Sequence, residues 1–215
     1  MKHVFGWAFP DADAFMVREM KPDGHYQFGH LEAALTHVTE FSIGIDAGAH
    51  VGTWSRPMAA RFARVIAVEP SPDTCDCLTV NMAAFGCTNV EIHQAALGAE
   101  AGFVEMAPLD PRAEALQNTG ARFVQDGGSI PRERIDDWHL ETCGFLKLDI
   151  EGSEPAALEG ARETLHRCRP IVLFENKGFW RHRYGRPIDA PQQILTSVGY
   201  RELAVVGCDR IWGPQ

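Results

Sequence analysis

The chain has 215 residues, and its 20 Lys and Arg against 29 Asp and Glu give a formal net charge of −9 with histidine neutral. A hydrophobic share of 45% and a charged share of 23% are ordinary for a globular domain, which argues against a disordered chain or a coiled coil. The shortage of basic residues argues against a nucleic-acid partner, because phosphate backbones bind to basic surfaces.

The sequence holds no stretch of about 20 mostly apolar residues, the length that a membrane-spanning helix needs. Its first residues reach Pro10 and Asp11 before the apolar core of a signal peptide could form. The six cysteines include no C-x-x-C pair, which favours free thiols over disulfides or zinc ligands. We therefore expect a cytoplasmic protein without a membrane partner.

Residues 1–40 have a helical pattern, with apolar residues at helical spacing. Helices are expected at residues 11–20 and 31–38. We expect this N-terminal helical segment to pack on the core or to cover a pocket. Residues 41–215 are expected to form a single globular domain, since no long Pro, Gly or Ser linker divides them.

The pattern of residues 41–215 alternates apolar strands with helices, as in an α/β sheet. Strands are expected at 41–46, 64–69, 90–95, 145–150 and 170–175, with weaker candidates at 103–106 and 122–125. Helices are expected at 53–63, 72–85, 153–166 and 191–198. Residues 200–212 indicate a closing antiparallel hairpin. The prediction is a mostly parallel sheet that ends in this hairpin and carries helices on both faces.

Four of the expected strands have an acidic residue at or next to their last position, and these residues are Asp46, Glu69, Asp149 and Glu175. The carboxyl ends of parallel strands meet at one edge of a sheet, which is where ligands bind in this class of fold. The four carboxylates are therefore expected to line one crevice. The structural alternative is that each acid only caps the helix that follows it.

A glycine-rich turn follows the first of these acids. Gly48 and Gly52 are expected to let the backbone approach a ligand closely, and Glu69 is placed to accept hydrogen bonds from both ribose hydroxyls. A dinucleotide-binding turn would read G-x-G-x-x-G and bind a pyrophosphate, whereas this turn reads D-x-G-x-x-x-G. Asp46 would repel a pyrophosphate but suits an ammonium and a sulfonium. The turn therefore indicates S-adenosyl-L-methionine.

Several runs in this sequence resemble the FkbM-type methyltransferase family, and they lie at 45–54, 68–72, 94–98, 147–154 and 169–175. The K-x-D-x-E-G-x-E run that begins at Lys147 is the most distinctive of them. The resemblance covers residues 41–175. It implies a Rossmann-like class I methyltransferase fold and S-adenosylmethionine as the cofactor. Many members of this family methylate hydroxyl groups on sugars or natural products.

The resemblance also implies a cofactor site, which consists of Asp46, Gly48, His50, Gly52, Thr53, Glu69, Ser71, Gln94 and Ala95. Asp46 and the two glycines would shape the methionine end, Glu69 would hold the ribose, and Gln94 with Ala95 would lie against the adenine. His50 departs from the family, which commonly has Asn at this position.

Methyl transfer from a sulfonium is an in-line displacement, and a hydroxyl acceptor benefits from a general base. Asp149 is the first candidate for this base and Glu175 is the second. Both could instead bind a divalent metal through oxygen, but the sequence does not require one and none is expected. Strand alternation would place Lys147 on the face of Asp149, paired with one of the acids. Tyr26 and His30 could reach the acceptor, or belong to an ordinary loop before a helix.

These residues predict an S-adenosylmethionine-dependent O-methyltransferase that acts on a small-molecule or glycan hydroxyl. Two other classes stay open at the level of sequence. A nicotinamide-dependent oxidoreductase would need a third glycine in the turn, and the sequence lacks it. A cofactor-binding module without catalysis would share the nucleoside site but would not depend on Asp149.

Overall fold

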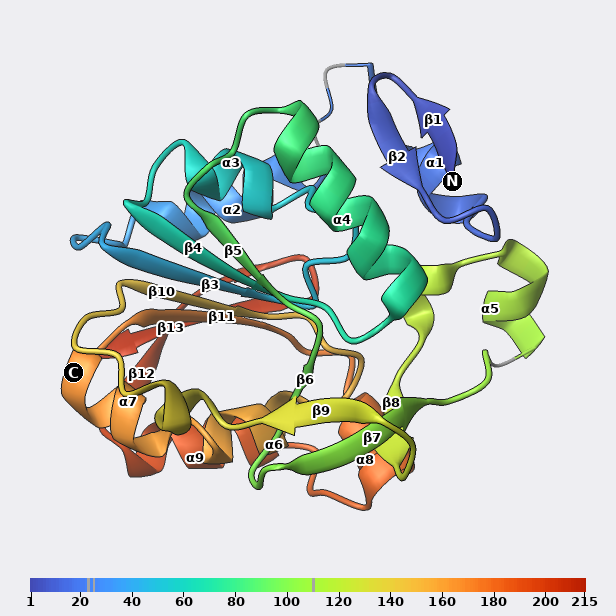
Figure 1. Cartoon of the computed structure of the whole chain (residues 1–215). Helices are drawn as coiled ribbons and strands as arrows, with labels where there is room; N and C mark the ends of the chain where they lie inside the picture. The colour runs from blue at the N-terminus through green and yellow to red at the C-terminus, as the bar shows by residue number, and fades with distance from the viewer. Residues whose placement is uncertain (23, 25, 110) are drawn as a thin grey trace.

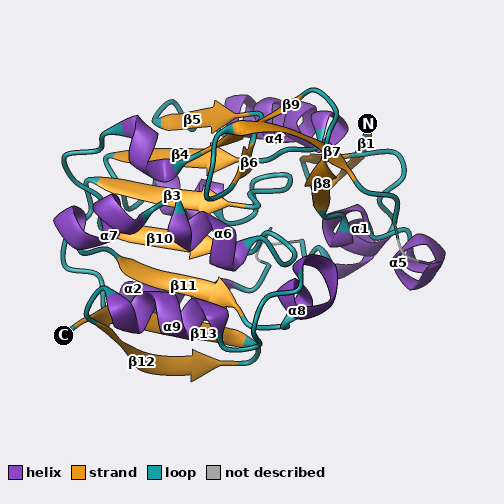
Figure 2. Cartoon of the chain, turned by 90° about the horizontal axis from the view of Figure 1, so that it is seen from below, coloured by secondary structure: helices purple, strands orange, loops and turns teal. Residues whose placement is uncertain are grey.

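A computed structural model of the chain describes all residues except 23, 25 and 110. Among the described residues, seven strands form the central sheet in the order β12-β13-β11-β10-β3-β4-β5 (Figures 1 and 2). Their bounds are Ile43–Ala47 for β3, Arg64–Val68 for β4, Val90–His93 for β5, Phe145–Leu148 for β10, Ile171–Glu175 for β11, Tyr200–Val206 for β12 and Asp209–Pro214 for β13. Strands β3, β4, β5, β10 and β11 pair in parallel, and β12 and β13 pair antiparallel. The predicted fold, with its closing hairpin, is confirmed.

Helices cover both faces of this sheet (Figure 1). One face carries α2 (Phe28–Leu35), α3 (Ser55–Ala59) and α4 (Pro72–Ala84), and the other carries α6 (Glu154–Glu159), α7 (Arg162–Cys168) and α9 (Ala190–Ser197). The strands between the two layers are almost fully buried, which explains why they read as continuous apolar runs instead of alternating ones. Gly86 follows α4 with φ +68°, the left-handed conformation expected for a residue just past a helix end.

The N-terminal 40 residues contain a hairpin that the sequence pattern did not indicate. Strands β1 (Lys2–Val4) and β2 (Trp7–Phe9) pair antiparallel, and α1 (Phe15–Glu19) follows them. All three residues of β2 are buried, so no alternation of apolar and polar residues marks the strand. The side chain of Asn81 on α4 binds the backbone of Ala8 in both directions, which fixes the hairpin against this helix.

The two N-terminal helices differ from the expected ones in different ways: α1 is shorter, whereas α2 has the expected length of 8 residues but starts earlier in the chain, at Phe28. The Asp13 carboxylate accepts the N–H of Met16 at 2.9 Å, which caps α1 and delays its start. The second helix, α2, begins after Gln27, whose φ of +51° is incompatible with a helix. The sequence therefore located the helices but placed their ends wrongly, because caps and left-handed residues determine the ends.

A second sheet occupies the region that the sequence left unresolved. In the part of the chain that the structure describes, it has four strands in the order β6-β9-β7-β8, with bounds Ala96–Leu97 for β6, Gly102–Met106 for β7, Val124–Asp126 for β8 and Ile130–Glu133 for β9. The short elements α5 (Pro111–Leu116), η1 (Thr119–Ala121) and η2 (Ile135–Trp138) lie in the same region of the sequence, and α8 (Phe179–Tyr184) follows β11.

The helix expected at 153–166 is divided in two at Gly160. A Cβ atom on Gly160 would lie 2.1 Å from the carbonyl oxygen of Gly98. The backbone next to the second sheet therefore approaches the helix where it breaks. No helix in the described part of the chain has both the length and the apolar character needed to cross a lipid bilayer.

Candidate cofactor and acceptor site

A cavity of about 520 Å³ opens at the carboxyl edge of the central sheet. The predicted site residues that line it are Gly48, His50, Thr53, Glu69, Ala95, Asp149 and Glu175. Four other predicted residues, Asp46, Gly52, Ser71 and Gln94, are not part of its lining. The crevice expected at the strand ends therefore exists, but some of the predicted residues act behind its wall or outside it.

The glycine turn lies directly over the end of β4. The N–H groups of Gly48 and Ala49 donate to the carbonyl oxygen of Val68 at 2.9 and 3.1 Å. Gly48 has φ +74°, and a Cβ atom there would lie 1.8 Å from the carbonyl oxygen of Asp149. Both conditions require glycine at this position.

Gly52 is also required by the protein itself. It has φ +96°, and a Cβ atom on it would lie 2.4 Å from Cε of Met82 on α4. The sequence interpretation, in which the glycines make room for a ligand, is therefore incomplete. Gly48 lines the cavity, but glycine is needed there because the backbone after β10 lies too close for a Cβ atom. Gly52 packs against the core.

Glu69 faces the cavity at the end of β4 and is 7% exposed. Its Oε2 accepts the N–H of His50 at 3.0 Å, and its Oε1 accepts the N–H of Ser71 at 2.9 Å. Burial raises the pKa of Glu69, although His50 and the Ser71 N–H group favour the charged form. Each carboxylate oxygen has a second lone pair, so Glu69 can hold the turn and still accept bonds from a ligand. Ser71 acts through Glu69 and does not line the cavity.

Asp46 lies behind the cavity wall and does not face a ligand. It is fully buried, and β3 and β10 pair so that Asp46 lies opposite Lys147. The Lys147 ammonium donates to Oδ1 at 2.8 Å, and Ser55 donates to Oδ2 at 2.6 Å. Although burial disfavours its ammonium, Asp46 and Asp149 raise the pKa of Lys147. The expectation that Asp46 attracts the cofactor's cationic groups directly is therefore wrong, because Lys147 already neutralises this carboxylate.

Lys147 connects this buried pair to the glycine turn. Its ammonium also donates to the carbonyl oxygens of Ala47 at 3.3 Å and Gly48 at 3.0 Å. The predicted pairing of Lys147 with an acid holds, but the acid belongs to the neighbouring strand. Glu151 lies beyond this strand, because the strand ends at Leu148 and Glu151 has φ +54°.

Two buried polar atoms near the turn lack a hydrogen-bond partner in the described part of the chain. His50 Nδ1 and Trp54 Nε1 are buried and unbonded among the described residues, and both side chains line the cavity. A native protein seldom leaves such atoms unpaired, so they fit a polar ligand at the turn. Together with the open lone pairs of Glu69, they fit the polar groups of an adenosyl cofactor.

The N-terminal segment reaches the same turn. His50 Nε2 lies 3.2 Å from Asp13 Oδ2 and 3.3 Å from Thr119 Oγ1. Thr119 in turn donates to Asp13 at 2.6 Å. Burial would raise the pKa of Asp13, but the bond from His50 lowers it below its usual value. His50 is therefore tied to residues before and after it that the sequence did not single out. Gln94 is exposed, whereas its neighbour Ala95 is buried and lines the cavity.

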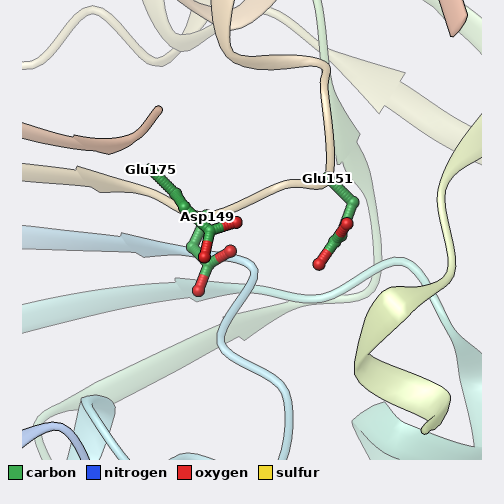
Figure 3. A group of neighbouring side chains, drawn as sticks. All are labelled: Asp149, Glu151 and Glu175. Atoms are coloured by element: carbon green, nitrogen blue, oxygen red, sulfur yellow. The ribbon is translucent and has the colours of Figure 1, made fainter. Parts of the chain in front are cut away.

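Three carboxylates gather in the cavity next to the end of β10. The side chains of Asp149, Glu151 and Glu175 place oxygens within 4.8 Å of one another. Figure 3 shows Asp149 and Glu175 close together where β10 and β11 end, with Glu151 farther along the loop that leaves β10. Burial, together with the Asp149 carboxylate, raises the pKa of Glu175 to about 9. A divalent cation could use these oxygens, but the Lys177 ammonium already lies 2.7 Å from Glu175 Oε1.

Glu151 and Asp149 differ in their partners. Glu151 lies near two cations, with Arg183 at 3.3 Å from Oε2 and Lys177 at 3.6 Å from Oε1. The Asp149 carboxylate has neither a hydrogen bond nor an ion pair among the described residues. The sequence analysis did not single out Lys177. Its position two residues after the end of β11 was a usable signal, because residues that follow parallel strands lie at the ligand-binding edge of the sheet.

One more acid on this edge was not predicted. Asp209, the first residue of β13, lies opposite Glu175 in the sheet and binds His30 Nδ1 at 2.7 Å. The sequence singled out His30 but gave no sign of Asp209, which follows a turn 179 residues later. Tyr26, the other candidate from this loop, also lines the cavity.

A family model described as the methyltransferase FkbM domain matches residues 46–202. The crystal structure of methyltransferase FkbM from Methylobacillus flagellatus KT is similar to this chain, with a TM-score of 0.52 and 21% sequence identity. The match covers 81% of this chain but 43% of that one, so this chain spans less than half of that protein's length. At this identity the likeness shows the fold alone.

A structure of magnesium protoporphyrin IX methyltransferase from Synechocystis PCC 6803 with bound S-adenosylmethionine has 17% identity and a TM-score of 0.49. That match covers 94% of this chain and 85% of the other. A search of curated proteins found no match to this chain.

Proposed function

This chain belongs to the FkbM methyltransferase family. We propose that it is an S-adenosylmethionine-dependent methyltransferase and that its acceptor is a hydroxyl group of a saccharide or a related small molecule. The observation that carries this proposal is the Asp149 carboxylate, which lines the cavity and has no hydrogen bond or ion pair among the described residues. A hydroxyl group needs a nearby proton acceptor to become a competent nucleophile, and Asp149 supplies one.

The cofactor end of the cavity is the glycine turn. Glu69 is proposed to accept hydrogen bonds from the ribose, while His50 and Trp54 offer nitrogens that no other described residue binds. Thr53 and Ala95 line the same cavity. When bound, S-adenosylmethionine supplies a methyl group on a positively charged sulfur. The Asp46–Lys147 pair acts indirectly, because its ammonium holds the carbonyl groups of the turn in place.

The acceptor end is the group of carboxylates. Asp149 is proposed to hold the acceptor hydroxyl and to take its proton as the new bond forms. Glu175 is proposed to fix Lys177 beside it, since these two groups lie 2.7 Å apart. The carboxylates that line the cavity are Glu69, Asp149, Glu151, Glu175 and Asp209. Ionised carboxylates among these residues repel acceptors that carry a phosphate or a carboxylate, although Arg122, Lys147 and Lys177 line the same cavity.

Residues 1–40 are proposed to complete the acceptor site. Phe15, Met16, Tyr26 and His30 line the cavity from this segment, and His50 joins it to the glycine turn through Asp13. These contacts support a covering role for the segment. The overall charge of −9 supports a small neutral acceptor over a nucleic acid.

The test is a transfer assay with S-adenosylmethionine that carries a radiolabelled methyl group. The acceptors are methyl hexopyranosides, a hexosamine and a hexuronic acid. We expect label in an ether of a neutral hexopyranoside. Label only on the amine or the carboxylate would overturn the proposal.

Two variants make the assay specific for the proposed base. Asp149→Asn is expected to lose turnover while it still binds S-adenosylhomocysteine. Asp76→Asn, an exposed aspartate on α4, is the matched control and is expected to be unchanged. If Asp149→Asn transferred methyl groups at the unaltered rate, Asp149 would not be the base.

A further inference from the structure

His30 and Asp209 form a bonded pair in the wall of the cavity. His30 lies in the first turn of α2, and Asp209 begins β13, so the pair joins the N-terminal segment to the sheet. His30 Nδ1 lies 2.7 Å from Asp209 Oδ2, and the two side chains are 30% and 8% exposed. Both residues line the cavity. A buried carboxylate therefore holds a partly accessible imidazole at the site.

Strand register places this pair at the acceptor end. In the antiparallel pairing of β11 with β13, Asp209 lies directly opposite Glu175. Residues opposite one another in such a pair project to the same face of the sheet. Glu175 and Asp149 carry oxygens within 4.8 Å of one another. The His30–Asp209 pair is thus next to the carboxylates proposed to bind the acceptor.

The carboxylate partner determines what the imidazole can offer. An ionised carboxylate only accepts hydrogen bonds, so His30 Nδ1 carries the proton and donates it to Asp209. In the neutral form of the ring, Nε2 then carries a lone pair. This nitrogen has no hydrogen-bond partner among the described residues. It can accept a hydrogen bond from a ligand in the cavity.

We propose that His30, held by Asp209, accepts a hydrogen bond from a second hydroxyl group of the acceptor. This inference rests on the proposed function, in which Asp149 binds the hydroxyl that is methylated. Asp149 and His30 are two separate hydrogen-bond acceptors on the cavity wall, so the ligand needs two hydroxyl groups as donors. The substrate that accepts the methyl group is therefore a polyol such as a pyranoside, and a molecule with a single hydroxyl group is a poor substrate. Asp209 is a positioning residue, since it acts through His30.

The titratable and charged groups that line the cavity around this pair are Tyr26, Lys147, Asp149, Glu151, Glu175, Lys177 and Cys208. Lys177 is turned to Glu175 and Glu151, and Lys147 to Asp46. Neither ammonium is bonded to Asp209, and among the described residues the side chain that binds the Asp209 carboxylate is His30. This arrangement makes His30 the group that Asp209 orients.

The test combines protein variants with altered ligands. Affinities of methyl hexopyranosides and of their single-deoxy derivatives are measured by calorimetry on the protein saturated with S-adenosylhomocysteine. His30→Asn keeps an amide near the place of Nδ1 but has no atom at Nε2. His30→Gln restores a polar atom at that distance. His166→Asn removes an exposed histidine from α7 and is the matched control.

For wild type, we expect one deoxy derivative to bind about five- to tenfold more weakly than its parent, the usual effect of one neutral hydrogen bond. His30→Asn should weaken the parent sugar by a similar factor and should not distinguish it from that derivative. This non-additivity is the mark of a direct contact. His30→Gln should recover part of the affinity, and His166→Asn should behave as wild type.

Two results would overturn the inference while leaving the proposed function in place. One is additivity, in which every deoxy derivative loses the same factor in His30→Asn as in wild type. The other is a His30→Asn enzyme whose kcat collapses while its KM is unchanged, which would make His30 the proton acceptor. If no hexopyranoside binds or is methylated, the saccharide proposal fails, and this inference fails with it.

Discussion

Replacing Glu69 with Gln should separate the two roles that the structure gives to this carboxylate. Its oxygens accept the N–H groups of His50 and Ser71 at 3.0 and 2.9 Å. The amide oxygen of Gln can keep one of these bonds, but its NH₂ group faces the other N–H, which is left unpaired. One unpaired buried donor costs about 1–3 kcal/mol of unfolding free energy. The variant should therefore remain folded but be measurably less stable.

Glu69→Gln should also weaken cofactor binding, because the variant loses a direct hydrogen bond to the ribose in addition to its loss of folding stability. A hydrogen bond to a charged group contributes about 1.5–3 kcal/mol, and Gln loses at least one such bond to the ribose. At about 1.4 kcal/mol per factor of ten, S-adenosylhomocysteine should bind roughly 10- to 150-fold more weakly. Calorimetry at 25 °C measures this change, with the exposed Glu163→Gln as a matched control. If Glu69→Gln bound S-adenosylhomocysteine as tightly as wild type, Glu69 would not hold the ribose.

Four further changes test other parts of the site. Lys147→Met strips the buried Asp46 of its cation and should cost about 3–5 kcal/mol in urea unfolding; a loss below about 1 kcal/mol would mean that Asp46 is not buried in solution. Asp149→Asn should keep cofactor affinity and the melting temperature while turnover falls about 10²- to 10⁴-fold; full turnover would remove it as the base. Gly48→Ala would place Cβ 1.8 Å from a carbonyl oxygen at φ +74°, so it should destabilise the fold and weaken S-adenosylhomocysteine binding, and unaltered calorimetry would contradict the turn geometry. Burial raises the pKa of Glu154 from 4.5 to about 7, so the folded state holds a proton that the unfolded state has released, and stability should fall as the pH rises from about 4.5 to 7. Glu154→Gln should remove about 3 kcal/mol of that decline, and identical pH profiles would contradict the shift.

The parts of the site that the sequence predicted depend on where single residues lie relative to the end of their own strand. Asp149 follows one apolar strand and Glu175 is the last residue of another. Parallel strands bring their carboxyl ends to the same edge of a sheet, whatever the length of the chain between them. Glu69 was found in the same way, together with its turn. These predictions need only that the strands run parallel in one sheet.

The parts that the sequence missed depend on register and long-range contacts. Asp46 looked like a ligand-facing acid, but the pairing of β3 with β10 sets it opposite Lys147 and buries it. His30 and Asp209 are 179 residues apart, and only the docking of α2 beside β13 joins them. The hairpin turn at Phe5 and Gly6 has φ values of +51° and +82°. Glycine there is a hairpin signal, but phenylalanine is not, so this turn was easily overlooked.

The central claim is that the cavity at the end of β3 and β4 binds the adenosyl cofactor through Glu69 and leaves Asp149 beside the acceptor. A crystal structure of the complex with S-adenosylhomocysteine measures this most directly. The account predicts ribose hydroxyl oxygens about 2.5–3.0 Å from the Glu69 carboxylate, with the sulfur on the side of Asp149. A nucleoside bound elsewhere, with Glu69 in contact only with the N–H groups of His50 and Ser71, would contradict it.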